Sequence, residues 1–232
     1  MTVISEGLFM NAGALEMHSL PESITTIEAY AYENCDNVKF DEFTISNNVT
    51  SIGEAVFRGT SNLAKLTIPF VGASRGINAD TTVDTNEVFG WIYGYASGDA
   101  TKYANIAIEQ ALKEVIITDD TIISPYAFSN ADYIEKVTIP NSVTRLGEYA
   151  FYDADKLTTV TFDETCQIEV IEDYTFAECD SLVMPTLPES VKVIEDYVFY
   201  NCIANPSFEV QNTVTSIGEY TFANCNDKND LS

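Results

Sequence analysis

One motif of about a dozen residues recurs along this chain and constrains the fold more than any other feature. It reads TSIGEAVFRGTSN at 50–62, TRLGEYAFYDADK at 144–156, KVIEDYVFYNCIA at 192–204 and TSIGEYTFANCN at 215–226. Its last aromatic residue falls 23 or 25 residues apart, except for one gap of 71, at Phe9, Tyr32, Phe57, Phe128, Phe151, Phe176, Phe199 and Phe222. A fixed period of this length indicates a repeat protein, in which each unit buries its apolar side against its neighbours.

After each aromatic anchor comes a short segment with apolar residues in an L-x-x-L-x-L frame. Clear copies are Leu63/Leu66/Ile68, Leu112/Val115/Ile117, Ile134/Val137/Ile139 and Leu157/Val160/Phe162, and weaker copies begin at Leu15, Phe40, Leu182 and Asn205. The alternation is typical of a half-buried strand. Eight such strands predict a leucine-rich-repeat solenoid.

The recurring motif itself is predicted to be the return half of each coil, with its Ile, Tyr and Phe residues in the core. Ser51-x-x-Glu54 and Ser216-x-x-Glu219 have the pattern of capping boxes that begin a helical turn. The predicted fold class is therefore an α/β repeat, with a parallel β-sheet on the concave face of the solenoid and short helical or 3-10 turns on the convex face. We expect one domain over 1–232, with an enlarged coil at 69–111 that breaks the 23-residue period.

The charge balance narrows the class of partner. The chain has 36 acidic and 11 basic residues, a formal net charge of −25, so nucleic acid and anionic membrane surfaces are not expected partners. It contains no apolar run of 18 residues, and its first residues lack the basic and apolar regions of a signal peptide. The expectation is an intracellular protein or a piece of a longer one.

Two stretches carry a resemblance to a known family. IPNSVTRLGEYAF at 139–151 and FYNC at 199–202 resemble the hallmark of the BspA-like leucine-rich repeats, the treponemal type. The resemblance implies a non-catalytic protein- or glycan-binding module of a bacterial cell-surface or secreted protein, engaged in adhesion to host matrix or to other microbes. It supplies no catalytic residues and no cofactor, and it places the signal peptide and anchor outside this segment. The alternative is a structural spacer or an intracellular interaction scaffold with no ligand of its own.

Residues between the last two apolar positions of each strand are expected to face outward on the sheet. They form a threonine row, flanked by lysines, that we take as the candidate ligand face: Thr44, Thr67, Thr138, Thr161 and Thr186, with Lys65 and Lys136 beside them. The competing interpretation is that threonine simply suits an exposed strand position. Within the enlarged coil, Trp91, Tyr93 and Tyr95 are either interface anchors or plugs of a wider coil.

The remaining reactive residues have structural interpretations. Cys35, Cys179, Cys202 and Cys225 share one repeat position with alanines, which predicts a small buried slot, whereas Cys166 is off-register and predicted to be exposed. The acids Glu6, Glu54, Glu148, Asp173, Asp196 and Glu219 form a stripe that is interpreted either as a Ca²⁺ site or, preferentially, as solvent-facing acids in the first turn of a helix. The only histidine, His18, is several coils from Cys166, so no nucleophile–histidine pair is predicted. The absence of a C-x-x-C motif argues against a zinc site, and neither a metal site nor an enzyme is predicted.

Overall fold

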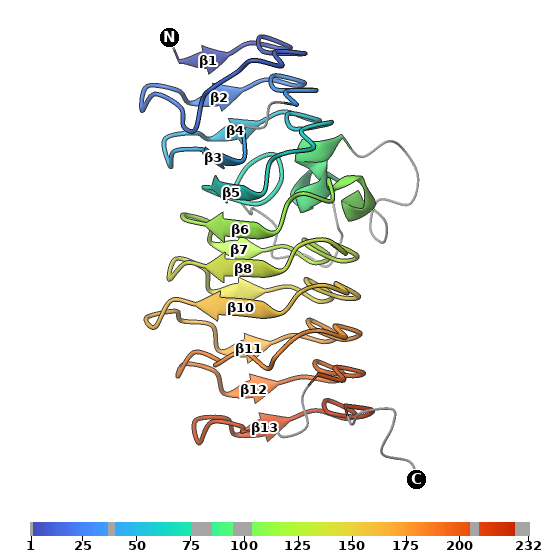
Figure 1. The fold of residues 1–232 in the computed structure, drawn as a ribbon. Helices are drawn as coiled ribbons and strands as arrows, with labels where there is room; N and C mark the ends of the chain where they lie inside the picture. Colours follow the sequence, from blue (N-terminus) through green and yellow to red (C-terminus); the bar gives the residue numbers. More distant parts are fainter. Residues whose placement is uncertain (1, 37–39, 76–84, 95–103, 205–208, 226–232) are drawn as a thin grey trace.

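The coils stack into a column with the two termini at opposite ends (Figure 1). The computed structural model describes residues 2–36, 40–75, 85–94, 104–204 and 209–225. One continuous apolar core runs through the column, from Ile4 to Cys225. The strands of the coils form two parallel rows joined by turns, and the first row is shorter than the second.

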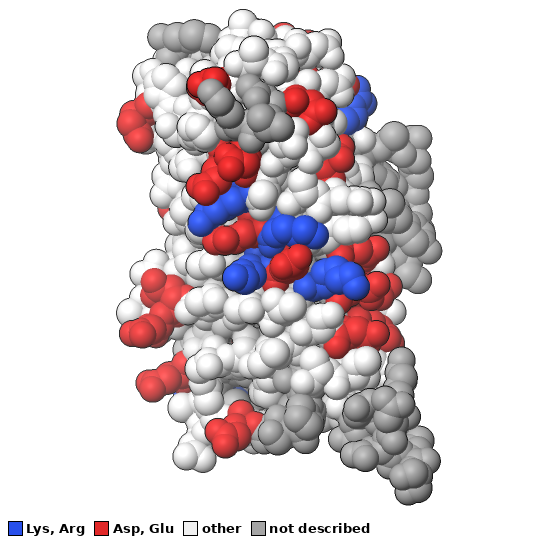
Figure 2. Space-filling view, viewed as in Figure 1, with Lys and Arg blue, Asp and Glu red and all other residues white. Residues whose placement is uncertain are grey.

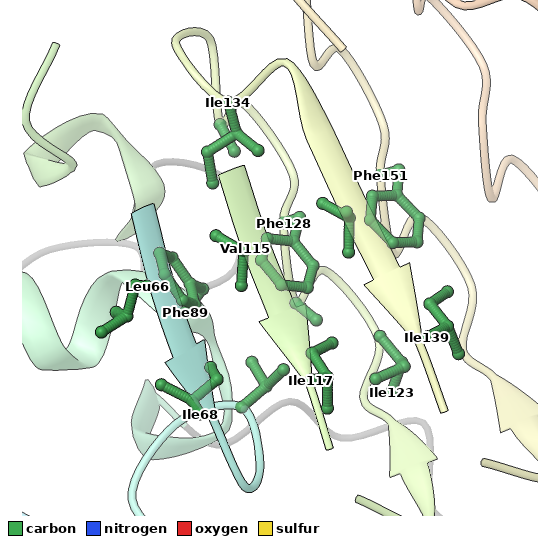
Figure 3. Packing of buried hydrophobic residues seen from close by; sticks show 14 of the residues in the cluster. Leu66, Ile68, Phe89, Val115, Ile117, Ile123, Phe128, Ile134, Ile139 and Phe151 are labelled. Carbon is green, nitrogen blue, oxygen red and sulfur yellow. The ribbon is translucent and has the colours of Figure 1, made fainter. Parts of the chain in front are cut away.

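The first row of strands is the parallel sheet that the L-x-L pattern predicts. Its strands follow the order β3 (Glu42–Thr44), β5 (Lys65–Ile68), β6 (Glu114–Ile117), β8 (Lys136–Ile139) and β10 (Thr159–Phe162). We call it the threonine sheet. Alternate residues such as Leu66, Ile68, Val115 and Ile117 point into the core (Figure 3), which confirms the inward and outward positions deduced from the pattern. Of the first predicted strand only Ser19 pairs, as an isolated bridge to Thr44.

The second row of strands was not predicted. It comprises eight two-residue strands. In Figure 1 the labelled strands of this row run across the column in the opposite direction to those of the threonine sheet. The eight strands are β1 (Val3–Ile4), β2 (Thr26–Ile27), β4 (Ser51–Ile52), β7 (Ile122–Ile123), β9 (Arg145–Leu146), β11 (Val170–Ile171), β12 (Val193–Ile194) and β13 (Ser216–Ile217). The enlarged coil divides this row into a three-stranded sheet, β1-β2-β4, and a five-stranded sheet, β7-β9-β11-β12-β13.

The prediction of helical turns on the return half of each coil was wrong. These segments are runs of hydrogen-bonded turns, and two residues per coil have positive φ, for example Tyr149 at 57° and Asp153 at 56°. A left-handed residue interrupts a right-handed helix, because only isolated residues adopt this conformation. Ser51 and Ser216, predicted as helix caps, lie in strands β4 and β13.

Helical segments in the described ranges occur only within the enlarged coil. They are three short 3-10 helices, η1 (Thr85–Glu87), η2 (Phe89–Tyr93) and η3 (Ala104–Ala107). The η2 segment takes the place of a repeat turn, because Phe57 N donates to Ile92 O at 2.8 Å on one side and Phe89 N donates to Ala127 O at 2.9 Å on the other. The enlarged coil thus keeps the two halves of the column in contact.

Asn105 links η2 to the following coil through hydrogen bonds of its side chain. Its side chain is buried, its Oδ1 accepts from Gly90 N at 2.7 Å, and its Nδ2 donates to Ser129 O at 2.8 Å. One side chain therefore satisfies backbone groups of η2 and of the following coil, which would otherwise be buried without partners. Asn105 gave no signal in the repeat pattern, since it lies outside the period.

Aromatic rings in contact with one another run through the core from one end of the described chain to the other, and they are stacked except around Tyr93, where they are tilted. Neighbouring ring centroids lie 5.0 to 6.4 Å apart in the order Phe9, Tyr32, Phe57, Tyr93, Phe89, Phe128, Phe151, Phe176, Phe199 and Phe222. We call this set the aromatic spine. Tyr93 and Phe89 of the enlarged coil bridge the 71-residue gap between Phe57 and Phe128, so the spine is continuous.

The predicted small slot beside each ring is confirmed, and all five cysteines are buried and free. The four cysteines at the repeat position donate their thiols to the carbonyl oxygen of the anchor residue one coil earlier, for example Cys179 to Phe151 O and Cys202 to Phe176 O, both at 3.0 Å. Cys166, predicted to be exposed, is also buried, with its thiol on Pro140 O at 3.2 Å, so that prediction was wrong.

Replacing Gly147 by Ala is expected to destabilise the column. A Cβ there would lie 2.5 Å from Pro125 N and 2.9 Å from its Cα, so the backbone of the preceding coil would have to move. We expect the free energy of unfolding to fall by about 3 kcal/mol, measured by urea denaturation. Gly13→Ala is the matched control, because nothing lies within 4 Å of its Cβ position. Equal stability of the two variants would contradict this account of coil stacking.

Thiol labelling should distinguish buried from open cysteines. Burial raises the pKa of Cys179 to about 12, and burial followed by Cys179 and Cys225 raises that of Cys202. Because the thiolate is the reactive form, neither should react with iodoacetamide at pH 8 until the protein is unfolded in urea. Thr44→Cys, at an exposed position, should react in the folded protein. Native labelling of Cys202 as fast as of that control would show that the slot is open.

Candidate ligand-binding face

The threonine sheet brings most of the predicted face residues into register. Thr44 pairs with Thr67, Thr67 with Ile116, Ile116 with Thr138, and Thr138 with Thr161. Thr44 and Thr161 are exposed, and Thr67 and Thr138 are half-buried. Adjacent strands are about 4.8 Å apart, so the row is a regular line of threonine side chains that Ile116 interrupts in the middle.

A row of alternating charges lies beside the threonines. Glu42, Lys65, Glu114 and Lys136 are successive register partners, and Lys65 Nζ lies 3.1 Å from Glu114 Oε1. Figure 2 shows that basic side chains gather over this part of the face, although the chain as a whole is strongly acidic. Opposite charges on neighbouring strands stabilise the sheet modestly and leave a mixed-charge surface.

Thr186 is not part of the sheet. The predicted strand at Leu182/Pro185/Leu187 does not form, and β10 is the edge of the threonine sheet. Proline has no N–H to donate to a neighbouring strand, so Pro185 disfavours pairing there. Pro185 is visible in the sequence, so the absence of a strand in this copy of the repeat could have been predicted.

A groove lies where the sheet stops. Its volume is about 930 Å³, and it is lined on one side by residues 158–165 and on the other by residues 183–189, with Gln211 beside them. Val183 is 62% exposed and Met184 is partly buried. The groove was not predicted, because no motif of the repeat marks it in the sequence.

The aromatic residues of the enlarged coil differ in burial and in contacts. Tyr93 is 1% exposed and belongs to the aromatic spine, so the interpretation of Tyr93 as an interface anchor was wrong. Trp91 is half-buried and its Nε1 donates to Ile52 O at 2.9 Å, which covers strand β4. Tyr95 lies outside the described residues. Phe89 is buried and fills the inside of the enlarged coil.

The acidic stripe connects coils. Asp173 Oδ1 accepts from Asp196 N at 2.8 Å, and Asp196 Oδ1 accepts from Glu219 N at 2.7 Å. The helical interpretation of the stripe was wrong, because these residues lie in turns that follow the strands. Among the residues that the structure describes, no group of three or more His, Cys, Asp or Glu side chains could hold a metal ion.

Beside the stripe, five tyrosines form a second stack near the surface. Neighbouring centroids are 4.7 to 5.0 Å apart along Tyr126, Tyr149, Tyr174, Tyr197 and Tyr220. The prediction that this tyrosine position lies in the core was wrong: four of these residues are half-buried, and Tyr220 is 59% exposed. All five have positive φ, the conformation of the tight turns that carry them. Burial, followed by the neighbouring tyrosines, raises the pKa of Tyr149 to about 12.

His18 and Cys166, the two residues considered for nucleophilic chemistry, contact different parts of the chain. His18 is exposed, and its Nδ1 lies 3.3 Å from Glu42 O, whereas the Cys166 thiol is buried against Pro140 O. Across the described ranges, no helix has the length and apolar character needed to cross a membrane.

Comparisons with solved structures give partial likenesses. A leucine rich cell surface protein from Faecalibacterium prausnitzii A2-165 is 24% identical over 97% of this chain and 55% of its own, with a TM-score of 0.49. A leucine-rich repeat protein from Bacteroides ovatus is 18% identical over 97% of this chain and 50% of its own, with a TM-score of 0.45. The T. pallidum Leucine Rich Repeat protein is 16% identical over 92% of this chain and 78% of its own, with a TM-score of 0.40. The chain thus spans about half the length of the first two.

The family comparison covers most of the chain. No curated protein matches it. Six copies of the BspA type leucine rich repeat region match residues 1–76 and 105–229, which leaves out only a part of the enlarged coil and the last residues. The matched residues carry the strands of both rows and the rings of the aromatic spine, apart from those of the enlarged coil. The chain belongs to the BspA-type leucine-rich repeat family.

Proposed function

We propose that this chain is a non-catalytic binding module of a bacterial surface protein, and that the threonine sheet is the face that engages a protein or glycan ligand. The observation that carries the proposal is the register of this face. It sets a line of threonines beside a mixed-charge row with lysines, on a chain whose net charge is −25. Extended sheet faces of solenoids are common binding surfaces.

Adhesion is the role that fits a module of this kind at the cell surface. The Faecalibacterium neighbour is described as a cell surface protein. For the present chain, a surface location and a ligand on host matrix or on another microbe belong to the proposal. An extended sheet face favours a macromolecular ligand, because small molecules are held in enclosed concave sites.

A paired substitution on the face tests the proposal. Thr67→Lys with Thr138→Lys puts two long charged side chains on the row while leaving the inward residues untouched. We expect binding of the immobilised module to a panel of purified matrix proteins and glycans to fall at least tenfold, because the new side chains obstruct close contact. Surface plasmon resonance gives the affinity, and thermal unfolding checks that the fold is kept.

The control uses the same chemical change on the other side of the column. Thr50 and Thr144 are exposed threonines next to strands β4 and β9, and Thr50→Lys with Thr144→Lys should leave binding unchanged. Equal binding by both double variants would place the ligand elsewhere. Absence of any bound ligand for the wild-type module would favour a structural spacer.

A further inference from the structure

We propose that the groove between β10 and residues 183–189 binds an extended peptide segment that combines aliphatic side chains with a basic residue. This assignment rests on the proposed binding function and narrows it to one site and one class of partner. It concerns the edge of the threonine sheet and not its centre.

The shape of the groove suits an extended chain. One wall consists of the consecutive residues 158–165, and the other consists of residues 183–189, so the groove follows the strand direction. Val183 N donates to Thr158 O at 3.1 Å and holds the two walls together at one end. Beyond that point, Pro185 disfavours continued pairing. A peptide in extended conformation fits such a site, with hydrogen-bonding groups along both sides.

The lining alternates apolar and hydroxyl groups. Val183, Met184 and Phe162 supply apolar surface, and Val183 is among the few large hydrophobic residues that are exposed in the described chain. Thr161 and Thr186, both exposed, supply hydroxyl groups. Exposed apolar surface that is rimmed by polar groups is typical of an interaction site, and here it favours aliphatic side chains on the partner.

The acidic residues of the groove favour a positively charged partner. Asp163, Glu164 and Glu189 line the groove and are exposed, and none of its lining residues is Lys, Arg or His. Asp163 Oδ1 accepts from Thr165 N at 2.9 Å and from Thr165 Oγ1 at 2.7 Å, which fixes this carboxylate at the rim. These two hydrogen bonds lower the pKa of Asp163, so it is ionised at neutral pH. A cationic side chain near this rim gains from the acids, and an anionic polymer is repelled.

Selection from a random peptide library tests the assignment without knowledge of the natural ligand. Twelve-residue peptides displayed on phage are selected on the wild-type chain and counter-selected on Thr161→Arg, in which a bulky cation enters the groove. We expect enriched peptides to carry Lys or Arg together with aliphatic residues. Synthetic copies should bind Thr161→Arg at least tenfold more weakly than wild type, and so should the triple variant Asp163→Asn, Glu164→Gln, Glu189→Gln, with the loss for the latter reduced at high salt.

Thr44→Arg is the matched control, because Thr44 is an exposed threonine of the same row, at the far side of the sheet from the groove. It should bind the peptides as wild type does. The assignment is overturned if no peptide is enriched, if the enriched peptides are acidic, or if they bind Thr161→Arg as well as wild type.

The same variants separate this assignment from the proposed function. A matrix ligand that is lost in the Thr67/Thr138 double variant but kept in Thr161→Arg leaves the sheet face as the binding surface and removes the groove. If peptides require the groove and no ligand is found for the sheet face, the groove assignment stands and the proposed role of the sheet face is removed.

Discussion

The column depends on contacts between the aromatic rings of neighbouring coils, with one ring from each regular coil and two from the enlarged coil. A single coil buries too little apolar surface to be stable by itself, and in this chain most rings of the aromatic spine are among the largest fully buried side chains. The spine is unbroken because Tyr93 and Phe89 fill the place of the absent repeat between Phe57 and Phe128. The enlarged coil is therefore part of the core, although its sequence departs from the period, and the strands β5 and β6 on its two sides still pair directly.

Other repeated positions serve the same contact between coils. Gly147 allows Pro125 of the preceding coil to approach, the repeat cysteines donate to a carbonyl group one coil away, and Asp173 accepts a backbone N–H of the next coil. Each of these interactions joins one coil to its neighbour and involves backbone groups that take no part in strand pairing. Surface features follow from this regularity, because equivalent positions of successive coils lie in line along the column. The threonine row, the acidic stripe and the surface tyrosines are such lines, and the groove forms where Pro185 interrupts the pattern.

The period and the L-x-L frame were sufficient to predict the solenoid and the inward residues of the five strands of the threonine sheet, because both depend on strand alternation. They also predicted a strand at Leu182/Pro185/Leu187 that does not form and one beginning at Leu15, of which only Ser19 pairs. The second row of strands was missed because each of its strands has only two residues, which is too short to show an alternation of apolar and polar positions. The turns were taken for helices because Ser-x-x-Glu also occurs at helix starts, whereas the positive φ of residues such as Tyr149 depends on tertiary context. In the candidate site, the register of Thr67 and Thr138 could be predicted, but the groove beside Pro185 and the burial of Tyr93 depend on how unlike coils pack.

Native-state hydrogen exchange on Phe89→Ala tests the continuity of the spine most directly. Removing this ring, which stacks 5.0 Å from Phe128, should cost about 3–5 kcal/mol and lower the protection of amides in the coils of both Phe57 and Phe128. Phe162→Ala removes the same atoms at a partly buried position outside the spine and should affect only coils next to β10. Loss of protection confined to residues 85–94, with both neighbouring coils unchanged, would contradict the claim that the enlarged coil joins the two halves of the column.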